Sequence, residues 1–178
     1  MIAGGQLPEK TSAPIVLISY VSWSGDVGRL ARFIRRDLEP DFRIEWAPIR
    51  PVHSRGYAGW LARSFIPGWR ERIRPVIIDL SRFDLVCLGF PKWTLSCPPL
   101  NEYLQLLERP QGKPFALFMS YGGFDEERYF RGIRRKIERA GAQVCCTTKV
   151  RRSALREGQH AASVTLFCDC IRRRLIDS

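Results

Sequence analysis

Short apolar runs alternate with longer amphipathic segments along most of this chain. Residues 15–18, 84–89 and 115–119 have the length and composition expected for strands that are buried on both faces. Residues 43–46 alternate weakly and predict a short strand at a sheet edge, and residues 142–148 predict a further strand. The pattern therefore predicts five strands, most of them buried.

The segments between these strands carry apolar residues at helical spacing. Three further stripes are present. One begins after the double proline at residues 98–99, a second ends just before Gly141, and a third begins at residue 164. Strands that alternate with helices in this way predict an α/β fold, a three-layer, doubly wound, five-stranded parallel sheet. The first stripe lies opposite a set of arginines and consists of Val27, Leu30, Ala31, Ile34 and Leu38.

One stretch interrupts the regular alternation. Residues 48–75 are rich in proline, tryptophan and arginine, and because structureless connections of this length are uncommon, we expect at least one short helix within them. Residues 1–13 show no periodicity and are expected to be a loose lead-in. We expect residues 14–178 to form a single domain that carries residues 48–75 as an aromatic, basic insertion.

A loop of hydroxyls and glycine joins the first predicted strand to the first predicted helix. It runs from Ser22 to Asp26 and contains Ser24 and Gly25. Free N–H groups at a helix N-terminus point outward, hydroxyls add donors, and the helix dipole favours negative charge, so we expect a phosphorylated ligand here. Asp26 offers an alternative, because an aspartate in this place can act as the N-cap and satisfy the same N–H groups.

The six cysteines lack the spacing of a metal site. Cys145 and Cys146 are adjacent on a predicted strand, so their side chains point to opposite faces. Cys168 and Cys170 lie far apart around a predicted helix, and no C-x-x-C is present. We therefore expect buried free thiols.

The loop at residues 22–27 and the elements around it resemble the flavodoxin family, in its short-chain form with strand order 2-1-3-4-5, over roughly residues 14–176. The resemblance implies a bound FMN whose phosphate lies in this loop and whose ring is contacted by the loops after the third and fourth strands. The phosphate-loop positions are Ser22, Trp23, Ser24, Gly25, Asp26 and Val27, with Val27 in place of a hydroxyl residue. The ring-contacting positions are Pro91, Lys92, Trp93 and Thr94 in one loop and Ser120, Tyr121, Gly122 and Gly123 in the other.

Residue chemistry agrees with parts of this transfer. An apolar, aromatic-lined slot with a few backbone donors suits a flat flavin, and Trp93 or Tyr121 could stack on it. The alternative for Trp93 is packing beneath its loop. Lys92 could stabilise a reduced, anionic flavin by its charge, and its alternative is an ordinary surface position.

The chain is strongly basic, with 29 Lys and Arg against 18 Asp and Glu and a formal net charge of +11. Typical flavodoxin carriers are acidic, so this charge indicates a different kind of partner, either an acidic redox protein or an anionic membrane surface. We do not expect a nucleic-acid partner, because the sequence contains no recognised nucleic-acid-binding motif. The predicted docking residues lie in the insertion and are Tyr57, Trp60, Arg63, Trp69 and Arg70; the alternative is that this segment packs as a cap over the sheet edge.

These observations favour a redox protein that holds FMN and transfers electrons to or from a partner protein or a small oxidant. One alternative is a flavin oxidoreductase of the quinone or protoporphyrinogen type. Another is a non-catalytic interaction subunit that has lost FMN through Asp26 and Val27. With no apolar run near the roughly 18 residues of a membrane span and no signal-like start, we expect a cytoplasmic protein.

Overall fold

The computed structural model describes residues 13–53 and 55–176. Within them, five parallel strands form a single sheet of order β2-β1-β3-β4-β5, with β2 at one edge as predicted. The predicted α/β class, parallel sheet and strand order are confirmed. The strands are β1 (Ile15–Val21), β2 (Arg43–Ile49), β3 (Leu85–Pro91), β4 (Pro114–Tyr121) and β5 (Gln143–Arg151).

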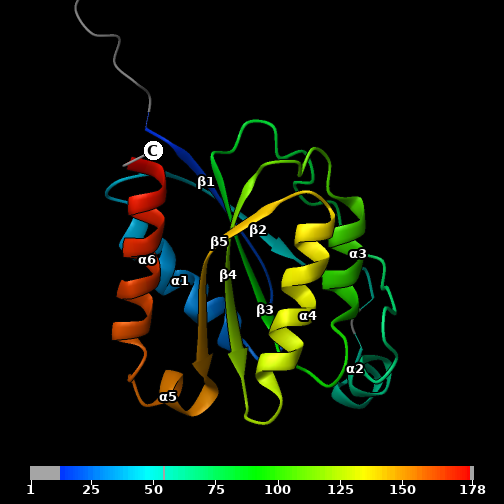
Figure 1. Ribbon diagram of the computed structural model, residues 1–178. Helices are drawn as coiled ribbons and strands as arrows, with labels where there is room; N and C mark the ends of the chain where they lie inside the picture. The colour runs from blue at the N-terminus through cyan, green and yellow to red at the C-terminus, as the bar shows by residue number, and fades with distance from the viewer. Residues whose placement is uncertain (1–12, 54, 177–178) are drawn as a thin grey trace, which may run out of the picture.

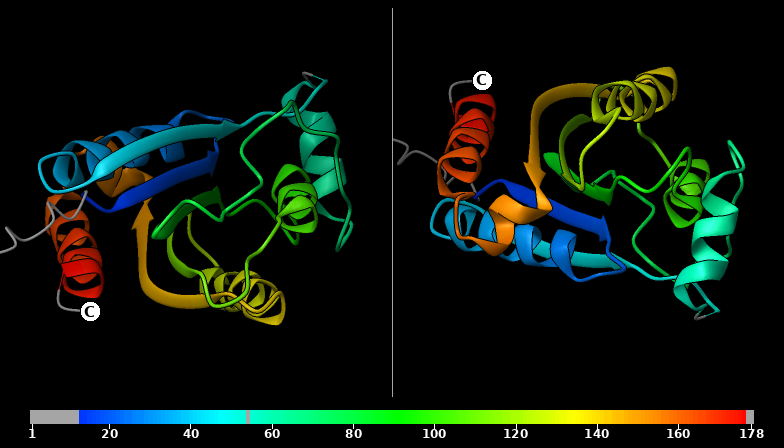
Figure 2. Two further views of the ribbon diagram at one scale, coloured as in Figure 1. Left: turned by 90° about the horizontal axis from the view of Figure 1, so that it is seen from above. Right: turned by 90° about the horizontal axis from the view of Figure 1, so that it is seen from below.

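Helices cover both faces of this sheet (Figure 1). One face carries α1 and α6, and the other carries α3 and α4, while α2 lies beside α3 on the side away from α1 and α6 (Figure 2). The helices are α1 (Asp26–Leu38), α2 (Tyr57–Ser64), α3 (Pro98–Leu106), α4 (Glu126–Arg139), α5 (Arg152–Arg156) and α6 (Ala161–Ile176). Within the described ranges, no helix combines the length and the apolar character that crossing a bilayer requires.

Alternate residues of the strands feed two hydrophobic cores, one on each face. Val16 and Ile18 point to the α1 and α6 side, whereas Leu17 points to the α3 and α4 side. In the middle of the sheet, the ring of Phe118 lies across Gly89, where an added Cβ would be 2.2 Å from two ring carbons. Only glycine fits this position of β3.

Most element boundaries differ from the predicted ones by one to three residues, as is usual where local patterning is weak. The expected short helix within residues 48–75 is α2. The short helix α5 lies directly after β5 and before the last helix, and the periodicity did not predict it. Residues 1–12 of the predicted lead-in lie outside the described residues.

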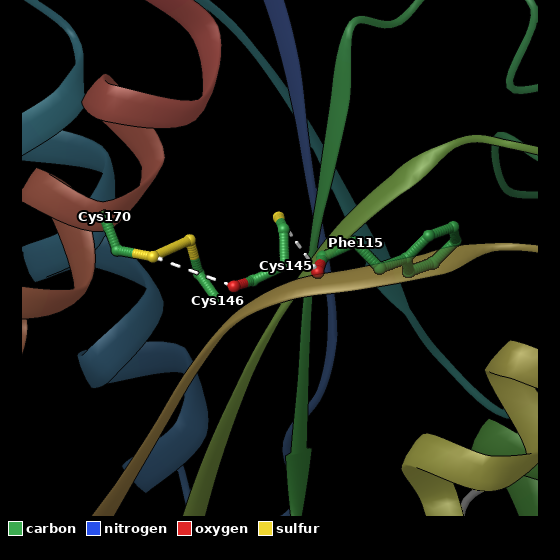
Figure 3. The surroundings of a disulfide bond; sticks show 4 residues. All are labelled: Phe115, Cys145, Cys146 and Cys170. Atoms are coloured by element: carbon green, nitrogen blue, oxygen red, sulfur yellow. Dashed lines mark hydrogen bonds between the residues drawn. A yellow bond between two sulfur atoms is a disulfide. The ribbon is translucent and has the colours of Figure 1, made fainter. Parts of the chain in front are cut away.

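The prediction of free thiols is wrong for one pair of cysteines. Cys146 on β5 and Cys170 on α6 form a disulfide, with an S–S distance of 2.17 Å and a Cα–Cα distance of 6.0 Å (Figure 3). The sequence argument compared only cysteines that share an element, whereas this bond joins a strand to a helix. The prediction is correct for Cys87, Cys97 and Cys168, which are free and buried, whereas Cys145 is free and only partly buried.

Candidate functional site

The loop between β1 and α1 is open at the helix N-terminus. Gly25 is the N-cap and has a φ of 85°, a left-handed conformation that glycine adopts without strain. The N–H of Gly28 donates to Ser22 Oγ at 3.1 Å, which satisfies one of the four N–H groups without an intrahelical partner. The remaining three, those of Gly25, Asp26 and Val27, have no hydrogen-bond partner in the part of the chain that the structure describes.

Asp26 does not cap this helix, so the alternative raised for it is wrong. It is the first residue of α1 itself, and no side-chain hydrogen bond caps the helix at Gly25. Its buried carboxylate accepts a hydrogen bond from Ser24 Oγ at 2.7 Å and lies 3.8 Å from Nη2 of Arg156. The carboxylate is therefore held beside the open amides, with one charge partner of its own.

A cavity of about 360 Å³ adjoins this loop at the carboxyl ends of the strands. Its volume lies at the lower end of the range for small-molecule and cofactor sites, roughly 300–1,000 Å³. Most of the predicted residues meet there, namely Trp23, Ser24, Val27, Pro91, Lys92, Trp93, Thr94 and Ser120. Three further lining residues were not predicted as cofactor contacts: Trp60 and Leu61 from α2 and Arg152 from α5.

Trp60 is the central aromatic wall of this cavity. Only 2% of it is exposed, and its ring centroid lies 6.0 Å from that of Trp23 and 5.7 Å from that of Trp93. Burial removes Trp60 from any docking surface, so that part of the docking prediction is wrong. Trp60 instead lines the cavity from α2.

Hydrogen bonds fix α2, and with it Trp60, to the loop that follows β3. The buried hydroxyl of Ser64 shares a hydrogen bond of 2.7 Å with Thr94 Oγ1, and the N–H of Leu95 donates to the Ser64 carbonyl at 3.0 Å. Thr94 therefore lines the cavity and also holds its wall in place.

Two buried polar atoms of the cavity-lining residues have no partner among the described residues. They are the Oγ of Ser120, at the end of β4, and the Nε1 of Trp60. Both residues are 2% exposed. Because buried polar groups in proteins are normally hydrogen-bonded, these two orphaned donors indicate a ligand with acceptor atoms.

The remaining predicted residues lie around this cavity without lining it. Ser22 and Gly25 border a smaller hollow of about 180 Å³ that shares Trp23 with the main cavity. The ring of Tyr121 lies beneath the guanidinium of Arg151, with 6.0 Å between the guanidinium carbon and the ring centroid. Gly122 lies against Arg152, and Gly123 adopts a φ of 112° in the turn that follows.

Cys97 precedes the double proline of α3 and is the free thiol closest in sequence to the cavity-lining loop. It is completely buried, and burial raises the pKa of its thiol to about 12. A thiol in this state is protonated at neutral pH and is a poor nucleophile. Cys97 therefore does not supply a nucleophile to this site.

Comparison with known proteins agrees with the fold described above. No family model matches the chain. A curated protein of Archaeoglobus fulgidus, described as an uncharacterized protein, is 29% identical over 138 residues, which is 78% of this chain and 86% of that protein.

Three solved structures give the comparison in three dimensions. A flavoprotein in complex with FMN from Lactobacillus acidophilus has a TM-score of 0.65 at 18% sequence identity. The match covers 82% of this chain and 98% of that protein's chain. Flavodoxin 2 from Bacillus cereus has a TM-score of 0.65 at 17% identity, covering 90% and 99%. An NADH:FMN oxidoreductase in its apo form has a TM-score of 0.63 at 13% identity, covering 90% and 89%. The chain therefore has the flavodoxin-like fold.

Proposed function

We propose that this chain, built on the flavodoxin-like fold, binds FMN non-covalently and uses it to transfer electrons. The observation that carries the proposal is the continuity of the open N-terminus of α1 with a cavity that three tryptophans surround and two orphaned donors line. An anion site next to a flat aromatic slot matches the two ends of FMN. The FMN complex of the Lactobacillus acidophilus structure supports the same ligand.

The residues of the site divide into two groups by what they offer this cofactor. The first-turn amides of α1, with the hydroxyl of Ser22, are suited to the phosphate because they supply donors at the positive end of a helix dipole, whereas the hydroxyl of Ser24 donates to Asp26. Trp60 and Trp93 are suited to the ring, since they exclude water and present aromatic faces. Bound FMN supplies reversible electron transfer, and the protein holds it and sets its environment.

The proposal is tested by titrating the purified protein with FMN and with riboflavin, following flavin fluorescence. We expect FMN to bind about a hundredfold more tightly than riboflavin, because charge-assisted hydrogen bonds to a phosphate contribute about 1.5–3 kcal/mol each. Asp26→Asn should tighten FMN binding about tenfold by removing a like charge, and should leave riboflavin binding unchanged.

Two outcomes would count against this assignment. Protein that takes up neither flavin at high micromolar concentration has no flavin site, which leaves the non-catalytic interaction subunit as the better account. If FMN and riboflavin bind with equal affinity and Asp26→Asn changes both affinities alike, the phosphate does not bind in the loop at residues 22–27.

Carrier and enzyme remain alternatives within the proposed function. The likeness to an NADH:FMN oxidoreductase supports assays with NAD(P)H and with quinones on the FMN-loaded protein. Turnover with either substrate favours an oxidoreductase, whereas reduction only by another redox protein favours a carrier. A location in the cytoplasm stays a prediction.

An acidic redox protein is the partner that we propose for this chain. Four large apolar side chains are exposed next to the α2 wall of the cavity. The side chain of Tyr57, which was also predicted to dock, lies outside the part of the chain that the structure describes. The N–H of Leu95 bonds to Ser64 O, which brings two of these segments together. The net charge of +11 and the flanking arginines favour an acidic partner over a neutral one. The exposed apolar residues are Phe65, Ile66, Trp69 and Leu95, and the flanking cations are Arg63 and Arg70.

Reversal of one exposed arginine tests this partner. Arg70→Glu should slow electron transfer from an acidic ferredoxin about fivefold at low ionic strength, with the difference lost in high salt, because rim charges act mainly on association. Stopped-flow reduction of the FMN-loaded protein measures the rate. Arg35→Glu, on α1, is the matched control, since both arginines are partly exposed and paired with a glutamate. Equal effects of the two variants, or binding of the protein to anionic vesicles alone, would contradict the proposed partner.

A further inference from the structure

Arg152 reaches the cavity because a glycine makes room for it. It is the first residue of α5 and follows β5 directly, at the carboxyl edge of the sheet. Its guanidinium lies against Gly122, where an added Cβ would be 2.6 Å from Nη2 and 3.2 Å from the guanidinium carbon. Any larger residue at position 122 would displace this side chain. The cation is therefore positioned by the loop that follows β4.

The cavity has two cations and no carboxylate among its lining residues. Arg152 lines it from α5, and Lys92 lines it from the loop after β3. Within residues 13–53 and 55–176, neither side chain has an ion pair or a hydrogen bond. Asp26 lies at the phosphate-loop side, where it is bonded to Ser24 and lies near Arg156. The positive charge of the cavity thus has no carboxylate partner among the lining residues, unlike that of Arg172 on α6, which pairs with three aspartates.

We infer that Lys92 and Arg152 make this site bind reduced FMN more tightly than oxidised FMN, which raises the midpoint potential of the bound cofactor. The inference rests on the proposed function. Addition of two electrons and one proton from a reductant, such as a reduced partner protein, leaves one negative charge on the flavin ring. A nearby cation stabilises that charge and has little effect on the neutral oxidised ring. The site is thereby set to accept electrons from its partner.

Neutral substitutions at the two cations test the inference. Arg152→Gln and Lys92→Gln should each lower the ratio of oxidised to reduced FMN dissociation constants about tenfold, which corresponds to about 30 mV for a two-electron couple. Each substitution should weaken the binding of reduced FMN more than that of oxidised FMN, and Arg152→Lys, which keeps the charge, should retain most of the wild-type potential. Equilibration with reference dyes during anaerobic reduction by dithionite measures the potentials.

Arg151 provides a matched control for this experiment. It precedes Arg152 by one residue, carries the same charge, and lies over Tyr121 rather than in the cavity. Arg151→Gln should shift the potential far less than Arg152→Gln. If FMN binds and the two variants shift the potential equally, the inference fails while the proposed function stands. If wild-type protein takes up no FMN, both are overturned.

Discussion

Replacement of Trp60 by alanine is expected to weaken FMN binding by about a hundredfold. The indole is buried between Trp23 and Trp93, so its removal deletes an aromatic wall and opens the cavity to water. Loss of a buried tryptophan side chain costs about 3–5 kcal/mol in a protein core, and a hundredfold in affinity is about 2.8 kcal/mol. Fluorescence titration with FMN measures the change, and circular dichroism reports whether the fold is kept.

A second substitution separates the role of Trp60 from that of the segment that carries it. Trp69 lies in the same insertion but is 41% exposed and does not line the cavity, so Trp69→Ala should leave the affinity for FMN within about twofold of wild type. Trp60→Phe keeps an aromatic wall and removes the orphaned Nε1 donor, and should weaken binding by about three- to tenfold. Loss of FMN binding in Trp69→Ala as well would assign the effect to disturbance of the whole insertion.

The architecture could be predicted because its strands and helices each leave a recognisable pattern of apolar residues in the sequence. Buried strands have a continuous apolar run and surface helices have a stripe, and right-handed crossovers leave few ways to connect them. The parallel topology also brings the loops after β1, β3 and β4 to one edge of the sheet, because the carboxyl ends of parallel strands meet there. The eight predicted residues that line the cavity, including Ser24, Trp93 and Ser120, came from the resemblance to flavodoxins, whose motif positions fall in these loops.

The missed wall residues come from segments without such a period. Trp60 was recognised as part of an aromatic, basic insertion, but composition alone does not say whether a tryptophan faces a partner or a cavity. Its burial depends on the hydrogen bonds between Ser64 and the loop at residues 94–95, which join positions 30 residues apart. Arg152 lies in a helix of five residues, too short to show a stripe, and only the contact with Gly122 reveals its place.

The disulfide was missed for a related reason. Periodicity gives the face on which a side chain lies only while the strand is regular. The prediction that Cys145 and Cys146 point to opposite faces is wrong, because the register shift at Phe115/Ala116 leaves both packed against the core under α1 and α6. Periodicity also does not give the distance between a strand and the helix that packs on it. Cys146 faces α6 from β5, and Cys170 lies opposite it (Figure 3).

Loss of this bond is expected to lower the free energy of unfolding by about 3 kcal/mol. The bond closes a loop with a sequence separation of 24 residues, and the chain-entropy model gives roughly that value for a loop of such length. In a domain of this size, the double variant Cys146→Ser, Cys170→Ser should melt roughly 10 °C below wild type. Thermal unfolding followed by circular dichroism, with and without a thiol reductant, measures the shift.

The reductant separates the effect of the bond from that of the sulfur atoms. It should lower the melting temperature of wild type to about that of the double variant and leave the double variant unchanged. Cys145→Ser with Cys168→Ala removes two free thiols from the same strand and helix and should remain sensitive to the reductant. Because α5 lies inside the closed loop, loosening it should also displace Arg152 and lower the potential of bound FMN, as Arg152→Gln does. A wild-type melting temperature that is indifferent to reductant would show that the bond contributes nothing to stability.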